Sequence, residues 1–500
     1  MINGTILQCF HWYTPADGYL WKQVAATAAD LAQAGFSALW LPPMTKASGG
    51  ADDVGYSAYD LYDLGEFDQC GSVATKYGSY QALLTAIAAA HTAGLQVYGD
   101  VVLHRKHGGD EVEHLSGTPV AWRNLDRAIG PTQTIAARSR FTFSGRGQRY
   151  SAMTWQGKHF QLVNHNCLAK PSDLAGQRVL YRLKSKPFSA EADVRLGRQE
   201  RCCELDLDMP VVAQALDDWG HWFVTTTGID GLRLDGAKHL SALFVQKWLW
   251  RLHERLAAER PEESDHPASA LFAMGDCWSD QVNDLHWYIA KSGGQLSLFD
   301  VPLHYNFHRA SRQGCYYDLR HVLTGTLMDE QPALAVTFVD NHNSQPLQIL
   351  ESPVEDWFKP LAYALILLRQ EGYPCVFAAD YYGAHAEIIN RLLWVRSHCA
   401  YGEQYDYFVR PDLIGWTRLG NAENLGAIAV VLSNHQGGSL WMELGKPDTQ
   451  FVDITQSLSE PVWTNANGWG NFDCSGRSVS VWVEAIYRDL AFDKLDRATP

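Results

Sequence analysis

Eight short apolar runs, separated by stretches of helical periodicity, limit the possible folds of this chain more than any other feature. Apolar runs of about four to eight residues are typical of buried strands. Parallel strands need helices on their outer face, and eight such units close into a (β/α)8 barrel. We therefore predict an α/β fold built on a TIM barrel. The strand candidates are residues 5–10, 38–41, 96–103, 231–234, 271–274, 296–301, 335–339 and 373–377; helical candidates include 21–34, 80–93, 211–226, 241–258, 357–368 and 388–398.

Two segments interrupt this alternation. Residues 104–210 are rich in Gly, Arg, Ser and His and lack a long helical period, which is too much chain for a plain loop. After about Cys399 the helical patterns stop, and short, turn-punctuated strands follow. We predict a barrel from residues 1–103 and 211–398, an inserted domain at 104–210 and a C-terminal antiparallel β domain at 399–500.

Charge and composition exclude several classes of partner. The formal net charge is −15, whereas nucleic acid or an anionic membrane calls for a basic surface. No run of about 18 apolar residues predicts a membrane span, and the first residues, MINGTILQCFHWY, lack the features of a signal peptide. The ten cysteines are scattered without CxxC spacing. We expect a cytosolic protein with reduced thiols and a neutral ligand.

The segment GIDGLRLDGAKH at 228–239 places Arg233 and Asp235 at the end of a predicted strand. Retaining cleavage of a glycosidic bond needs a carboxylate nucleophile and a carboxylic acid, and Asp235 suits the nucleophile. Arg233 lies two residues earlier on the same face, where a cation would keep that carboxylate ionised and oriented. A purely structural Arg–Asp ion pair is the alternative. Other polar strand ends lie at Asp100, Asp276 and 340–343.

Nine segments taken together resemble the α-amylase family, glycoside hydrolase family 13, over nearly the whole chain. The intracellular or bacterial liquefying type is the most similar. The resemblance implies a (β/α)8 barrel, the insertion as domain B, a C-terminal β-sandwich and an α-1,4-glucan or maltooligosaccharide ligand. The segments are QCFHWY (8–13), WLPP (40–43), DVGYSAYDLYDLGEF (53–67), DVVL (100–103), GLRLDGAKH (231–239), FDVPLHYNF (299–307), FVDNH (338–342), YGEQYDYF (401–408) and DLIGWTR (412–418).

The resemblance also implies roles for individual residues. Tyr56 would stack on the sugar at the cleavage point, although a packed loop aromatic is the alternative. Asp100 would support the site, Lys238 and His239 would contact the neighbouring sugar, and His342 would contact sugar hydroxyls.

Three positions depart from the family pattern. Asp276 stands where the family has the general acid Glu, so the carboxyl group is one methylene further back. Asn343 replaces an Asp that stabilises the transition state, and an amide cannot supply that charge. Arg105 replaces a sugar-contacting His, and its cation disfavours a positive transition state unless it turns outward or pairs with a carboxylate such as Asp100. His104 is a neighbouring candidate for the lost role.

The calcium site that the resemblance implies is also altered. Asp206 and Asp208 match its paired aspartates, Glu200 could stand in for another ligand, and the carbonyl of His239 is available. A poor calcium donor, His104, replaces an Asn ligand, and acidic residues are replaced by Asn164 and Asn166. These changes make a calcium cofactor doubtful, and a softer metal on His104, His107, Cys202 or Cys203 is the alternative.

Three interpretations follow from these residues. The first is an α-glucan-binding protein with impaired hydrolysis, a pseudoenzyme, because three changes disturb different parts of one reaction. The second is an active retaining hydrolase or transglycosidase in which Asp276 still serves as the acid. The third is that Asn343 was introduced to trap substrate, which leaves the other changes without a cause.

Overall fold

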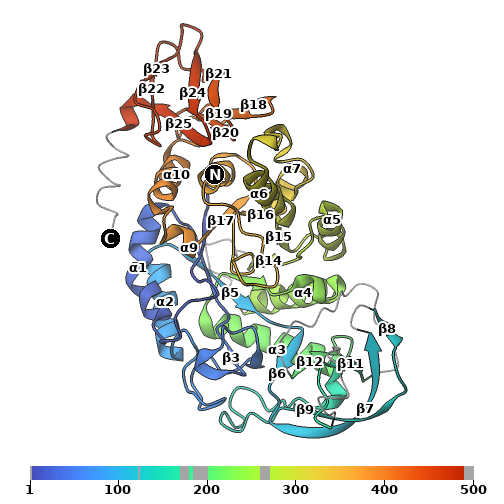
Figure 1. The fold of residues 1–500 in the computed structure, drawn as a ribbon. Coiled ribbons are helices and arrows are strands. Elements are labelled where there is room, and N and C mark those ends of the chain that lie inside the picture. Colours follow the sequence, from blue (N-terminus) through green and yellow to red (C-terminus); the bar gives the residue numbers. More distant parts are fainter. Residues whose placement is uncertain (1–2, 122–123, 169–178, 184–200, 260–270, 489–500) are drawn as a thin grey trace.

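Eight parallel strands close into a barrel, as the sequence predicts (Figure 1). The computed structural model describes residues 3–121, 124–168, 179–183, 201–259 and 271–488. Every pair of neighbouring barrel strands is parallel. In order around the barrel, the strands are β1 (Ile6–Gln8), β2 (Ala38–Leu41), β5 (Gln96–Val101), β13 (Gly231–Leu234), β14 (Phe272–Gly275), β15 (Ser297–Phe299), β16 (Ala335–Phe338) and β17 (Tyr373–Phe377).

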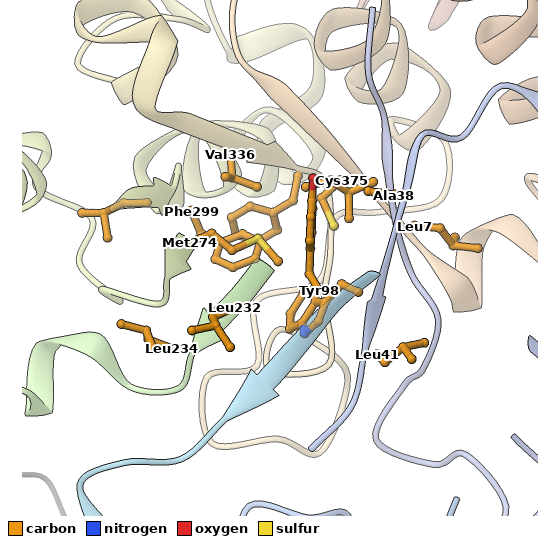
Figure 2. Close-up of a cluster of buried hydrophobic side chains, with 14 of the residues drawn as sticks. Leu7, Ala38, Leu41, Tyr98, Leu232, Leu234, Met274, Phe299, Val336 and Cys375 are labelled. Carbon is orange, nitrogen blue, oxygen red and sulfur yellow. The ribbon is translucent and has the colours of Figure 1, made fainter. Parts of the chain in front are cut away.

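The barrel strands are buried on both faces, which explains why they are continuous apolar runs and not alternating ones. All four residues of β2, β13 and β16 are buried. Figure 2 shows side chains from different strands, among them Leu232, Met274, Phe299 and Val336, gathered in one buried cluster. Burial of this apolar surface is the main driving force for closing the barrel.

Helices follow the strands on the outside of the barrel. Six begin and end within two residues of the prediction, whereas α5, α6, α7 and α9 lie outside the helical segments that the sequence predicts. The α6 helix begins where a strand was expected to continue, because the buried Asp300 carboxylate accepts the Leu303 amide (3.1 Å) and caps the helix. The helices are α1 (Leu20–Ala34), α2 (Tyr80–Thr92), α3 (Pro210–Thr227), α4 (Ala242–Ala258), α5 (Val282–Lys291), α6 (Val301–Gln313), α7 (Leu327–Glu330), α8 (Lys359–Leu368), α9 (Ala378–Tyr381) and α10 (Ala386–His398).

A second sheet occupies the segment predicted as an insertion. It has the order β6-β12-β10-β11-β7-β8, with β9 paired to β7, and all its pairings are antiparallel. Its strands are β6 (Arg105–His107), β7 (Glu111–Ala121), β8 (Asn124–Ala128), β9 (Gln133–Arg140), β10 (Phe160–Val163), β11 (Val179–Arg182) and β12 (Cys202–Leu205).

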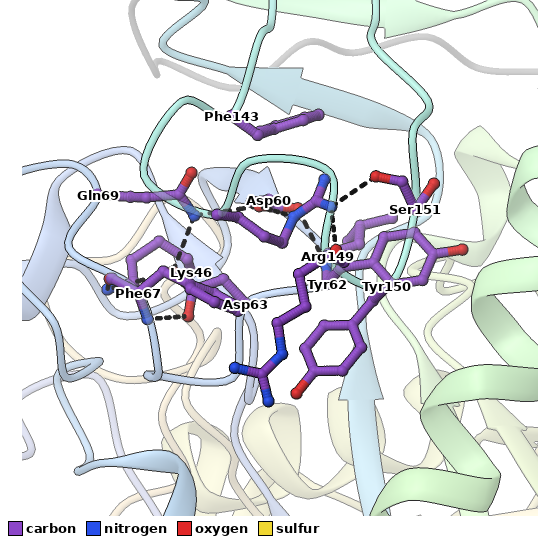
Figure 3. A network of polar contacts seen from close by, with 12 residues as sticks. Lys46, Asp60, Tyr62, Asp63, Phe67, Gln69, Phe143, Arg149, Tyr150 and Ser151 are labelled. Carbon is purple, nitrogen blue, oxygen red and sulfur yellow. Dashed lines mark hydrogen bonds and ion pairs between the residues drawn. The ribbon is translucent and has the colours of Figure 1, made fainter.

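A buried ion pair fastens this sheet's connecting loop to a hairpin of the barrel. The hairpin, β3 (Lys46–Ala47) and β4 (Ala58–Asp60), follows β2. The Arg146 guanidinium Nε lies 2.7 Å from Asp60 Oδ2, and both side chains are 1% exposed. Lys46 and Asp63 form a second buried pair, at 3.5 Å, within the segment that contains the hairpin. Figure 3 shows this network, in which Arg146 and Asp60 are 86 residues apart in the chain.

The C-terminal part of the chain is antiparallel β structure, as predicted. A six-stranded sheet, β18-β19-β20-β25-β22-β23, packs with the pair β21-β24 around Leu413, Val431, Met442, Phe472 and Trp482. Its strands are β18 (Gln404–Arg410), β19 (Leu413–Arg418), β20 (Ile428–Ser433), β21 (Gly437–Glu443), β22 (Gln450–Asp453), β23 (Val462–Trp463), β24 (Trp469–Ser475) and β25 (Ser478–Glu484). Among the described residues, no helix combines the length and apolarity needed to cross a bilayer.

Candidate active site

The carboxyl ends of neighbouring barrel strands bring four charged residues together. Arg233 on β13 lies in register with Asp100 on β5. Asp235 directly follows β13, and Asp276 directly follows β14. Because parallel strands end at the same edge of a barrel, their terminal side chains converge where functional groups of such barrels are found. The structure therefore places together the residues that the sequence singled out as nucleophile, acid and support.

The buried guanidinium of Arg233 contacts all three carboxylates. Its Nη1 donates to Asp100 Oδ1 (3.0 Å) and Oδ2 (3.1 Å) and to Asp235 Oδ1 (2.8 Å). Its Nη2 donates to Asp276 Oδ2 (2.7 Å). The side chain of Arg233 is fully buried. One fixed, planar cation therefore sets the relative positions of the three carboxyl groups.

Burial raises the pKa of Asp100 and Asp276 in this cluster. Desolvation raises the pKa of Asp276, although the Arg233 cation opposes that shift. Desolvation likewise raises the pKa of Asp100, which also accepts hydrogen bonds from Tyr56 Oη (2.8 Å) and Trp40 Nε1 (3.2 Å). A carboxyl group that retains its proton at higher pH is suited to donating it to a leaving oxygen.

Arg105 points toward the predicted nucleophile. Its Nη2 lies 3.4 Å from Asp235 Oδ2, and the two side chains are 12% and 11% exposed. The partner is Asp235 and not Asp100, the pairing considered from the sequence. Because Arg233 contacts Oδ1, both carboxylate oxygens of Asp235 face a guanidinium group. The neighbouring His104 ring is buried and packs 5.5 Å from the ring of His239.

Asn343 lies beside the predicted acid. Its Nδ2 donates to Asp276 Oδ2 at 3.3 Å, and its backbone amide donates to Asn341 Oδ1 at 2.8 Å. Asp276 Oδ2 therefore accepts from both Arg233 and Asn343. Asn343 adds a hydrogen-bond donor to this position but no negative charge.

Three nearly parallel rings form one wall of the site. Tyr56 lies 5.2 Å from His342 with an interplanar angle of 1°, and Trp12 lies 6.0 Å from Tyr56 at 2°. Gln8 Nε2 lies 3.1 Å from His342 Nδ1, and burial together with the Arg233 cation lowers the pKa of His342 well below its ordinary value. His342 is therefore neutral.

The sequence predicts Tyr56 and His342 as site residues but does not single out Trp12 and Gln8. Both belong to the segment QCFHWY, which carries part of the family resemblance. Tyr56 is 4% exposed, whereas Trp12 is half-buried, so Trp12 offers the more accessible ring.

Lys238 and His239 lie in a short 3-10 turn, Ala237–His239, separated from Asp235 by Gly236. Lys238 Nζ donates to the backbone oxygen of Trp278 at 3.0 Å. This bond links the loop after β13 to the loop after β14. The predicted sugar contacts of Lys238 and His239 stay predictions.

Two side chains of the implied calcium site, Asn164 and Asn166, accept hydrogen bonds from the backbone, and calcium binding there stays a prediction. Asn164 Oδ1 already accepts the Cys202 amide at 2.7 Å, and Asn166 Oδ1 accepts the Ala136 amide at 3.0 Å. Glu200 lies outside the described residues, and Asp206 and Asp208 follow β12.

Two of the softer donors, His107 and Cys202, are paired across β6 and β12. Burial raises the pKa of the Cys202 thiol to about 12. Burial also raises the pKa of Cys203 well above its ordinary value. Within the described ranges, no three His, Cys, Asp or Glu residues are grouped so that they could hold a metal ion.

Comparison with known proteins places the chain among carbohydrate-active enzymes. No protein-family model matches it. It is 45% identical over 493 residues to an α-amylase of Geobacillus stearothermophilus, covering 96% of this chain and 87% of that protein. It is 37% identical over 504 residues to the cytoplasmic α-amylase of Escherichia coli K12, covering 97% and 99%. The chain belongs to the α-amylase family.

Solved structures of α-amylases have the same fold as this chain. An α-amylase of Geobacillus thermoleovorans, complexed with acarbose, has a TM-score of 0.60 at 15% identity over 97% of both chains. An α-amylase of Malbranchea cinnamomea has a TM-score of 0.61 at 14% identity, again over 97% of both chains. At these identities the likeness establishes the barrel fold with its additional domains.

Proposed function

We propose that this family member binds α-1,4-glucan chains at the carboxyl ends of its barrel strands and hydrolyses them very slowly. The observation on which the proposal rests is that both oxygens of Asp235 face guanidinium groups, from Arg233 and Arg105. Contact with two cations lowers the nucleophilicity of both oxygens, and Arg105 stands beside the oxygen that Arg233 leaves open. We expect hydrolysis to be several orders of magnitude slower than in a variant that carries Asp276→Glu, Asn343→Asp and Arg105→His.

Support for glucan binding comes from the ring wall and from relatives. The half-buried ring of Trp12, stacked on Tyr56, offers apolar surface to a sugar ring. The buried Asp100 and His342 hold this wall in place through hydrogen bonds with Tyr56 and Gln8. A relative 41% identical over 493 residues, from Bacillus sp. strain 707, is named glucan 1,4-α-maltohexaosidase. Binding would use the groups that the three replacements leave unchanged.

Support for slow hydrolysis comes from the steps of a retaining reaction. Asp235 would attack the anomeric carbon while Asp276 protonates the leaving oxygen, and water would then release the sugar from the glycosyl-enzyme. Arg105 must move away for the attack, and the shorter Asp276 must reach its oxygen while Arg233 and Asn343 occupy Oδ2. Asn343 adds no charge to stabilise the positive transition state.

We expect the unaltered chain to bind maltoheptaose with a Kd in the micromolar to millimolar range and to release reducing ends at or near background. Calorimetric titration and a reducing-end assay on soluble starch measure the two quantities on one preparation. The Asp235→Asn variant, purified in parallel, reports any contaminating amylase. Turnover of starch well above that variant, at rates typical of enzymes (about 1–10³ per second), would refute the proposal.

Trp12→Ala is expected to weaken maltoheptaose binding about tenfold, because it removes the accessible ring of the wall formed with Tyr56 and His342. The same titration measures the change. Trp250→Ala is the matched control, since that indole is 53% exposed on helix α4, and its affinity should equal that of the unaltered chain. Equal affinity in both variants would show that sugars do not stack on this wall.

A second candidate function is an active retaining hydrolase or transglycosidase. One observation favours it: desolvation raises the pKa of Asp276, which keeps a proton available for the leaving oxygen. In that case hydrolysis should decline as the pH rises through the raised pKa of Asp276. An activity that responds in this way and is lost in Asp276→Asn would favour this candidate over slow hydrolysis.

We also propose that the protein acts in the cytosol. The Escherichia coli relative, 37% identical, is named a cytoplasmic α-amylase. All ten cysteines are free in the structure, including the adjacent Cys202 and Cys203, as expected in a reducing compartment. Fractionation of cells of the source organism with an antibody to the chain tests this placement.

A further inference from the structure

We infer that the Arg105 guanidinium joins the inserted sheet to the barrel and positions Asp235. It takes the place of the calcium ion that the family resemblance implies at this junction. The inference concerns how the two parts of the chain are held together. It therefore stands independently of whether the site hydrolyses glucans.

The position of Arg105 in the fold allows one side chain to bridge both parts. Arg105 is the first residue of β6, four positions after β5 ends, and lies opposite Glu204 of β12 in the inserted sheet. Its guanidinium reaches Asp235 after β13 of the barrel (3.4 Å). The ion pair thus crosses from the insertion to the barrel, where it is largely shielded from water.

The charges around this side chain match those of a cation site. Asp235 and Glu204 are both buried, at 8% and 2% exposure. Glu204 is the register partner of Arg105 across β6 and β12. Arg105 therefore provides positive charge close to two buried carboxyl groups.

A divalent ion at this junction would meet an unfavourable environment. It would be repelled by the guanidinium of Arg105, which directly follows the expected donor His104 in the chain and is paired with Glu204 across the inserted sheet. The amide oxygens of Asn164 and Asn166 are already used by backbone donors. His104 Nδ1 has no hydrogen-bond partner among the described residues, but a single imidazole nitrogen is a poor calcium donor.

Chelation of the unaltered protein tests the inference without any variant. We expect EDTA followed by gel filtration, or addition of millimolar CaCl2, to change Tm by less than about 1 °C, because no metal binds the native state preferentially. Elemental analysis of protein purified without added calcium should find far less than one calcium per chain. A loss of several degrees on chelation that calcium restores would overturn the inference.

Substitution of Arg105 tests the contact itself. Arg105→Ala is expected to lower Tm by at least about 3 °C, and Arg105→Lys to recover part of the loss, because the ammonium keeps the charge but not the planar fork. Arg140→Ala is the control, since its pair with Glu111 is about half exposed on both sides. An unchanged Tm in Arg105→Ala would contradict the bridge.

A double-mutant cycle separates positioning of Asp235 from general packing. If Arg105 acts through Asp235, then Arg105→Ala should lower Tm much less in an Asp235→Asn background. An equal loss in both backgrounds would show that Arg105 does not act on Asp235. All these readouts are thermal, so failure of the hydrolysis proposal would leave them unchanged. If Arg105→Ala does not fold, Arg105→Lys and the chelation experiment still decide.

Discussion

The triple variant Asp276→Glu, Asn343→Asp, Arg105→His is expected to hydrolyse soluble starch at least about 10³-fold faster than the unaltered chain. Glutamate at 276 extends the acid by one methylene toward the leaving oxygen. Aspartate at 343 supplies the charge that Asn343 lacks. Removal of the guanidinium at 105 frees Asp235 Oδ2, which Arg105 contacts at 3.4 Å. General acid catalysis contributes about 10²–10⁴-fold and one electrostatic stabiliser about 10²–10³-fold, so the estimate is conservative.

Two control variants make this gain interpretable. Adding Asp235→Asn to the triple variant should return the rate to background, because the nucleophile is then absent. A matched variant with Asp280→Glu, Asn421→Asp and Arg140→His makes the same chemical changes at exposed positions and should gain nothing. The assays should be run at temperatures well below the Tm of the triple variant. Replacing Arg105 also removes the bridge between the inserted sheet and the barrel, so this variant should be less stable. If the triple variant folds but gains no activity, the defect lies elsewhere in the site.

The eight barrel strands could be predicted from the sequence because each is buried on both faces and therefore appears as a continuous apolar run. Three of them, at 38–41, 231–234 and 373–377, have the predicted bounds. The start of α6 could not be predicted from periodicity, because the Asp300 cap ends the strand within the apolar run. Tertiary hydrogen bonds of this kind override local pattern.

The candidate site could be predicted in part, for a related reason. Strand ends fix where Asp100, Arg233, Asp235 and Asp276 converge, so their proximity follows from the barrel. The direction of Arg105 does not follow, because it depends on how β6 of the inserted sheet is placed against the loop after β13. Long-range placement of a long, flexible side chain leaves no local pattern in the sequence.

Arg233→Met is expected to lower the free energy of unfolding by roughly 3–5 kcal/mol, the largest loss from any single change considered for this chain. The substitution keeps much of the side-chain volume but leaves Asp100, Asp235 and Asp276 without the buried cation that contacts all three. Thermal and urea unfolding measure the loss. Arg140→Met, whose pair with Glu111 is exposed, should lose less than about 1 kcal/mol.

The pH dependence of this loss identifies its cause. Desolvation raises the folded-state pKa of Asp100 and of Asp276 above the unfolded value. A carboxyl group shifted in this direction contributes stability below its unfolded pKa and loses it as the pH rises through its folded pKa. Without Arg233 these shifts grow, so the deficit of Arg233→Met should be small in acid and increase toward neutral pH. Adding Asp100→Asn and Asp276→Asn should recover much of it. If neither low pH nor the two Asp→Asn substitutions reduce the deficit, the loss comes from packing and not from charge. Packing is the alternative because the guanidinium also lies 5.1 Å from the centre of the Trp40 ring.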